Sequence, residues 1–226
     1  MIQRLVVSAL IAGFGAGLIA ALLQLVFVQP VLLHAELFES GQLTHFGAQA
    51  TAASVDVPRF DPLRDLLSVV FTALIYTGYA LVMLSAMSFA EERGQPITPR
   101  TGIIWGIAGF IAVHLAPAFG LAPELPGMNA ADVTVRQIWW FATVIATAIA
   151  LWFIAFGKNW AMWGTAIILI AAPHIIGAPM PDTFTGPAPS ELAATFAARA
   201  LGVGLAAWVS LGMLLGWVWN SKLADV

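Results

Sequence analysis

The chain has 226 residues, of which 60% are apolar and only 9% are charged, and its mean hydropathy is +0.90. Soluble domains carry roughly 25% charged residues, so this composition excludes a protein that faces water on all sides. The net charge of −3 argues against a nucleic-acid partner, and the absence of cysteine excludes disulfides, thiolate metal sites and iron–sulfur clusters. We therefore expect an all-α, polytopic integral membrane protein.

Six apolar stretches are long enough to cross a bilayer as helices, since a span needs about 20 residues to cross the ~30 Å hydrocarbon core. The first stretch begins after Arg4 and has about 24 residues, which exceeds the roughly 7–15 residues of a signal-peptide core, so we expect a retained helix. Its glycines, Gly13, Gly15 and Gly17, are typical of close helix packing. The predicted spans, in one transmembrane domain over residues 1–226, are 5–28, 66–90, 102–121, 133–156, 161–178 and 196–219.

The connections between these stretches predict the topology. Asp61-Pro62 and Thr98-Pro99 each combine a capping side chain with proline at the first helical position, which indicates a helix start. The long connections 29–65, 120–132 and 179–195 alternate with short ones, so six spans place them all on one side and both termini on the other. Lys and Arg are slightly more numerous on the terminus side, and we therefore expect cytoplasmic termini.

Histidines recur where the first, third and fifth spans reach the long-connection side. Each is followed by an acid and then by an arginine near the start of the next span. This order indicates an internal repeat of two-helix units, a common arrangement in transporters, whose sites lie at repeat interfaces. The fourth histidine, His45, lies in a polar connection, where we expect it to be solvated. The three sets are His34, Glu36 and Arg64; His114, Glu124 and Arg136; and His174, Asp182 and Arg199.

Metal coordination is the chemistry that suits these sets. Neutral imidazole is a good ligand for cobalt, nickel, zinc and copper, and carboxylates complete or orient the coordination sphere. Prolines near His114 and His174 free backbone carbonyls, which is tolerated at membrane depth where protein or a water-filled cavity satisfies them. We expect His114 and His174 to be the central ligands, and Arg136 and Arg199 to orient the acids. The further candidate ligands are Glu124, His34, Glu36 and Asp182.

Two simpler interpretations stay open at this point. A histidine at the end of a span often only forms hydrogen bonds at the membrane interface. The acids can simply pair with Arg64, Arg136 and Arg199, and such pairing would neutralise the field that attracts a cation.

The stretches around the two central histidines resemble a known family. The segment HLAPAFGLAPELPG from His114, the segment PHIIGAP from Pro173, and the opening helix after Ile2-Gln3-Arg4 are similar to CbtA, a proposed cobalt transporter subunit of bacteria. The resemblance extends over essentially the whole chain. It implies cobalt uptake for cobalamin synthesis across the bacterial inner membrane, beside a small one-span partner, CbtB, with a His-rich terminus. The family motifs fall on His114, Pro117, Glu124 and Pro126, and on Pro173, His174 and Pro179.

The leading functional hypothesis is a membrane subunit of a divalent-metal uptake system, with Co²⁺ or Ni²⁺ as the transported ion and no permanently bound cofactor. No GxxxxGK[ST] loop occurs, so we expect the energy to come from an ion gradient or a partner protein. One alternative is a haem-binding protein with His114 and His174 as axial ligands, and another is a structural subunit of a larger membrane complex. We expect no enzyme, because no Ser-His-Asp order, HExxH pair or nucleophile elbow is present.

Overall fold

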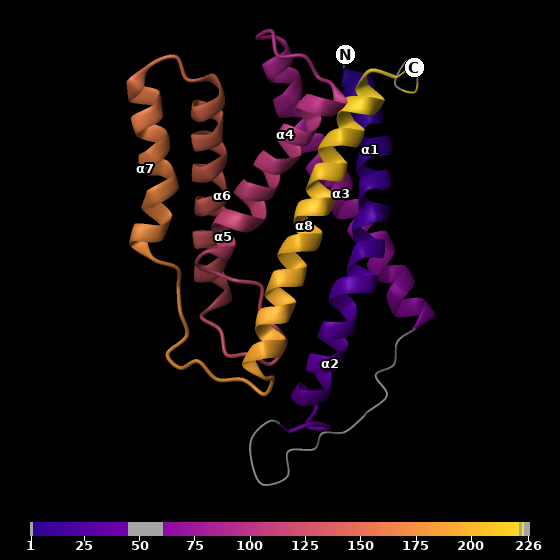
Figure 1. Cartoon of the computed structure of the whole chain (residues 1–226), viewed down its shortest axis with the longest axis vertical. Coiled ribbons are helices and arrows are strands. Elements are labelled where there is room, and N and C mark those ends of the chain that lie inside the picture. The colour runs from indigo at the N-terminus through magenta and orange to yellow at the C-terminus, as the bar shows by residue number, and fades with distance from the viewer. Residues whose placement is uncertain (1, 45–60, 222, 224–226) are drawn as a thin grey trace. The chain divides into compact units, whose positions relative to one another are not determined.

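The computed structural model describes residues 2–44, 61–221 and 223, and these residues form helices and connections without any strand (Figure 1). Two of the helices, labelled η1 and η2, are short π-helices. The elements are α1 (Ile2–Leu23), η1 (Gln24–Val28), α2 (Gln29–Glu39), α3 (Pro62–Glu91), α4 (Pro99–Phe110), η2 (Ile111–Leu115), α5 (Ala116–Ala118), α6 (Val133–Phe156), α7 (Trp160–Ile176) and α8 (Ser190–Trp219).

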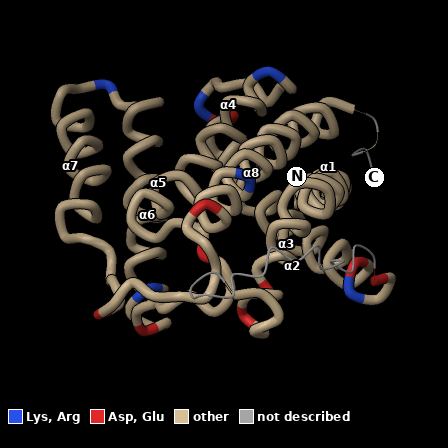
Figure 2. The backbone as a smooth tube through the Cα atoms, turned by 60° about the horizontal axis from the view of Figure 1, so that its bottom comes forward, with Lys and Arg blue, Asp and Glu red and all other residues tan. Residues whose placement is uncertain are grey.

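Five helices in the described part of the chain are long and apolar enough to cross a membrane. They are α3, α6, α8 and two composite helices, Ile2–Glu39 (α1, η1 and α2) and Pro99–Ala118 (α4, η2 and α5). The sixth expected span corresponds to α7, which is apolar and has 17 residues. Charged residues lie mostly near helix ends and in connections, leaving long uncharged stretches between them (Figure 2). These features confirm the all-α, polytopic membrane class.

Each π-helix precedes a proline. η1 ends two residues before Pro30, and η2 ends two residues before Pro117. Inside an α-helix, proline lacks an N–H donor and its ring clashes with the carbonyl four residues back, whereas i→i+5 bonding shifts the neighbouring carbonyls. In η1 the N–H of Gln29 donates to the carbonyl of Gln24. Both helices therefore continue past their prolines. The prediction that a connection begins at residue 29 was therefore wrong, because the helix continues to Glu39.

The described residues fall into two compact units. The first contains residues 2–29, 61–110 and 202–221, and the second contains residues 30–44 and 111–201. All six candidate ligands belong to the second unit.

In the first unit, α1 packs against α3 through glycines. A Cβ atom at Gly13 would lie 2.6 Å from the Cα of Thr77, and one at Gly17 would lie 2.4 Å from the Cα of Ala73. Real Cβ atoms do not approach backbone so closely, so the helices meet at this distance only because both positions lack side chains. The packing predicted for Gly13 and Gly17 is confirmed, whereas at Gly15 a Cβ would make an ordinary 3.7 Å contact.

Both helix starts predicted from proline pairs are confirmed. α3 begins at Pro62, and the Asp61 side chain accepts hydrogen bonds of 3.0 and 3.1 Å from the N–H groups two and three residues later. α4 begins at Pro99, and the Thr98 hydroxyl accepts a 3.2 Å hydrogen bond from the N–H of Thr101. Each cap satisfies N–H groups that have no partner inside the helix.

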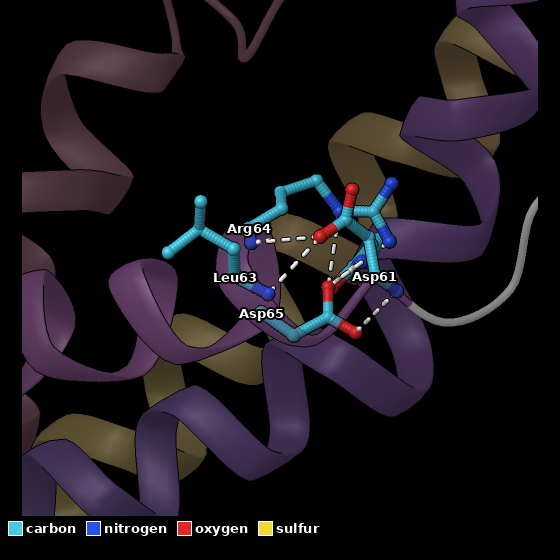
Figure 3. Close-up of polar contacts among 5 residues, drawn as sticks. Asp61, Leu63, Arg64 and Asp65 are labelled. Atoms are coloured by element: carbon cyan, nitrogen blue, oxygen red, sulfur yellow. Dashed lines mark hydrogen bonds and ion pairs between the residues drawn. The ribbon is translucent and has the colours of Figure 1, made fainter.

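A buried carboxylate joins α3 to the end of η1 (Figure 3). Asp65 is 8% exposed and accepts hydrogen bonds from Gln29 Nε2 at 2.8 Å, Arg64 Nε at 3.0 Å and the N–H of Asp61 at 3.3 Å. Arg64 also forms an ion pair with it at 3.0 Å. Arg64 therefore pairs with its sequence neighbour, a partner that the histidine–acid–arginine pattern did not anticipate.

A second polar contact joins the same helices two turns further along α3. The hydroxyl of Thr72 donates to Gln24 Oε1 at 3.2 Å. Gln24 and Gln29 are five residues apart, and the i→i+5 bonding of η1 brings them close to one another on the helix surface. The π-helix thus presents both glutamines to the two buried polar residues of α3, Thr72 and Asp65.

In the second unit, α6 and α7 lie side by side and are connected by a short turn (Figure 1). The side chain of Asn159 caps α7 by accepting a 3.0 Å hydrogen bond from the N–H of Met162. α6 also contacts η2 and α5. A small apolar core of Ala35, Leu125 and Ala188 joins α2 to the two long connections of this unit.

Candidate metal site

The two central histidines lie near the ends of two helices that both contact α6. His114 is the fourth residue of η2, and His174 lies in the last turn of α7. Both side chains are half-buried. The geometry of the second unit therefore gives each imidazole a protein surface on one side and leaves part of it accessible.

The chain segments that carry these histidines are in direct contact. The ring of Phe119 meets the imidazole of His174 edge to face, with 5.1 Å between ring centroids. Gly120 packs so closely on the end of α7 that a Cβ there would lie 2.7 Å from the Cβ of Ala178. Because a larger residue at position 120 would clash, the close approach of the two segments depends on this glycine.

Trp139 of α6 contacts both segments. Its indole N–H donates a buried 3.1 Å hydrogen bond to the carbonyl of Pro173, which also accepts from the N–H of Gly177 at 3.0 Å. Its ring centroid lies 6.1 Å from that of His174. Sequence reasoning did not select this tryptophan, because neither periodicity nor composition shows which carbonyl an indole will meet.

The two ring nitrogens of His174 differ in their surroundings. Its Nδ1 atom is buried, and no hydrogen bond to it is formed by any residue that the structure describes. Burying a polar atom without a hydrogen bond is unfavourable, so the proton of the neutral imidazole is expected to reside on Nε2.

Glu124 is held by an arginine. Its carboxylate forms a 2.6 Å ion pair with Arg136, and the two side chains are 37% and 28% exposed. The expected role of Arg136 in orienting this acid agrees with the contact, as does the simpler interpretation that the two charges only pair. A cation at Glu124 would have to compete with the guanidinium.

The connections on either side of α6 and α7 are also joined. Asn129 donates from its side chain to the carbonyl of Thr183 at 3.0 Å, and from its backbone to that of Thr185 at 2.8 Å. A Cβ at Gly186 would lie 2.2 Å from the sulfur of Met128, so the two connections pack closely. The connection that bears Glu124 is therefore an ordered part of the second unit.

The remaining candidates are spread over the second unit. His34 and Glu36 are exposed on α2, where the His34 ring lies 5.6 Å from that of Phe38, and Asp182 is exposed in the connection after α7. Arg199 is exposed on α8, and His45 lies outside the described residues. In the described ranges, no three His, Asp or Glu side chains gather closely enough to hold a metal ion. The six candidate ligands are thus not one cluster, and their role stays a prediction.

Comparison with known proteins identifies the family. The family model described as probable cobalt transporter subunit (CbtA) matches residues 2–220. No curated protein and no solved structure matches the chain. The family match covers nearly the whole chain, including both histidine segments, and the chain therefore belongs to the CbtA family of probable cobalt transporter subunits.

Proposed function

We propose that this chain binds Co²⁺, or the similar ion Ni²⁺, at the ends of η2 and α7, and passes it to a path between its helices. His114 and His174 are the central ligands of this site. The observation that carries the proposal is the direct contact between the two histidine segments, at Phe119 against His174 and Gly120 against Ala178. These contacts join segments about 60 residues apart in the sequence, and they involve His174 itself and two residues that follow His114 by five and six positions. Imidazole is a good ligand for cobalt.

The nitrogen that binds the ion at His174 is Nε2, since Nδ1 is buried. A metal at Nε2 would move the imidazole proton to Nδ1, where no acceptor is available among the described residues. This weakens binding, and weak binding suits transport, because an ion must leave a site as well as enter it. The proposal also includes four side chains that attract the cation or share its coordination, namely Glu124, His34, Glu36 and Asp182.

We place this site on the outer face of the bacterial inner membrane, with both termini in the cytoplasm. A small CbtB-like one-span protein is the proposed partner for initial capture of the metal. The slight excess of Lys and Arg on the terminus side of the predicted topology supports cytoplasmic termini.

Metal binding to the detergent-purified protein tests the proposal. We expect Co²⁺ to bind in stoichiometric amount, and His114→Ala and His174→Ala each to weaken binding by about tenfold or more. His45→Ala is the matched control and should bind as the wild type does. Liposomes that contain the wild type should take up Co²⁺, and both variants should lower the rate. Absence of Co²⁺ and Ni²⁺ binding would refute the proposal, and a Soret band in the purified protein would instead support the haem alternative.

A further inference from the structure

We propose that Trp139 is a positioning residue for His174, an inference that rests on the proposed function of that histidine as a metal ligand. Trp139 is 8% exposed and belongs to α6, whereas the histidine belongs to α7. It holds the imidazole through two contacts, one with the backbone and one with the ring.

The backbone contact fixes the peptide group that carries the histidine. The carbonyl of Pro173 belongs to the peptide bond between Pro173 and His174, and it accepts the indole N–H at 3.1 Å. A proline in the last turn of a helix weakens the turn around it, because its own nitrogen donates no hydrogen bond. The bond from Trp139 compensates by anchoring this turn to a neighbouring helix.

The ring contact limits the rotation of the imidazole. The indole and Phe119 approach the His174 ring at interplanar angles of 66° and 74°, with centroids 6.1 and 5.1 Å away. The indole is itself held on its other edge, since a Cβ at Gly120 would lie 2.7 Å from its Cη2 atom. The ring therefore spans the distance between the two histidine segments and leaves the imidazole few orientations.

A histidine that is already held in place loses less conformational freedom when it binds a metal. The effect of Trp139 on the affinity for Co²⁺ should therefore depend entirely on the presence of His174. A tryptophan that only stabilises packing would affect metal binding equally whether or not the histidine is present. This difference separates the two roles.

A double-mutant cycle on the full-length, detergent-purified protein provides the test, with Co²⁺ as the titrated ligand. Trp139→Phe keeps a ring and removes the N–H donor, and Trp140→Phe is the matched control at the adjacent position. We expect Trp139→Phe to raise the Kd for Co²⁺ about tenfold in the wild-type background and to have no further effect in the His174→Ala background. Trp140→Phe should leave the Kd unchanged in both backgrounds.

Equal effects of Trp139→Phe in the two backgrounds would overturn the positioning role, and so would an unchanged Kd in the wild-type background. These results leave the proposed function intact, whereas a wild type that binds no Co²⁺ overturns both. A metal-free measurement gives a second test. We expect diethylpyrocarbonate to modify His174 several-fold faster in Trp139→Phe than in the wild type or Trp140→Phe, and equal rates would contradict the inference.

Discussion

Gly106→Ala is expected to destabilise the protein, because α4 meets α8 backbone to backbone. A Cβ at Gly106 would lie 2.3 Å from the carbonyl oxygen of Trp208 and 3.0 Å from the Cα of Val209. One turn away, Gly102 and Gly212 are equally close, and a Cβ on either would lie about 2 Å from the carbonyl oxygen of the other. The obstructing atoms belong to the main chain, so no side-chain rotation can relieve the clash.

The magnitude follows from the distance that the helices must move apart. An ordinary contact of a Cβ begins at 3.4 Å, so the contact of 2.3 Å must lengthen by about 1 Å. Overpacking of this kind typically costs about 1–3 kcal/mol. The higher helix propensity of alanine offsets up to ~1 kcal/mol of it. We therefore expect the free energy of unfolding to fall by about 1–2 kcal/mol.

Reversible unfolding in mixed micelles, followed by far-ultraviolet circular dichroism as the fraction of denaturing detergent rises, measures this change. Gly78→Ala in α3 is the matched control, since a Cβ there meets nothing within 4 Å. It should be as stable as the wild type or more stable by up to ~1 kcal/mol. If Gly106→Ala proved as stable as Gly78→Ala, the reasoning from backbone contact would be refuted.

Two further perturbations concern the polar contacts. Gln29→Leu removes the 2.8 Å hydrogen bond to the buried Asp65 carboxylate. We expect the free energy of unfolding, measured in the same assay, to fall by about 1–3 kcal/mol. An unchanged free energy of unfolding would mean that water replaces the amide as the hydrogen-bond donor. Arg136→Gln breaks the partly exposed ion pair with Glu124, so we expect a stability change below ~1 kcal/mol. Because the guanidinium competes with a cation for Glu124, the same variant should tighten Co²⁺ binding about two- to fivefold at low salt. Weaker binding in a calorimetric titration would contradict this competition and support the orienting role of Arg136 instead.

Much of the fold could be predicted because hydrocarbon imposes strong rules on sequence. Long apolar stretches give the spans, and the pairs Asp61-Pro62 and Thr98-Pro99 give two helix starts at the residues where the structure has them. The first span was predicted to end at residue 28, where the apolar stretch ends, whereas the helix continues past Pro30 to Glu39. The local change to i→i+5 bonding that accommodates Pro30 leaves no simple signal in residue types.

Sequence reasoning could select the candidate ligands of the site by their chemistry, but it could not predict how they are arranged in space. His114 and His174 were selected as candidate ligands by imidazole chemistry and nearby prolines, but their spacing in the sequence gives no distance in space. The contact at Gly120 and the hydrogen bond from Trp139 depend on how α6 packs against its neighbours. Asp65 was missed because it lies at a helix start, where an acid is ordinarily explained by the helix dipole.

The π-helices ahead of Pro30 and Pro117 have a consequence for any comparison of related chains. Each inserts one residue beyond the α-helical count, which rotates everything after it by about 100° around the helix axis. A helical wheel drawn through residues 2–39 would consequently assign His34 to the wrong side of the helix. Deleting one residue from η1 should return this turn to α-helical bonding and leave His34 and Glu36 facing the same direction. A one-residue gap in this region of an alignment therefore indicates a relative without the π-helix, in which the end of the helix keeps its orientation.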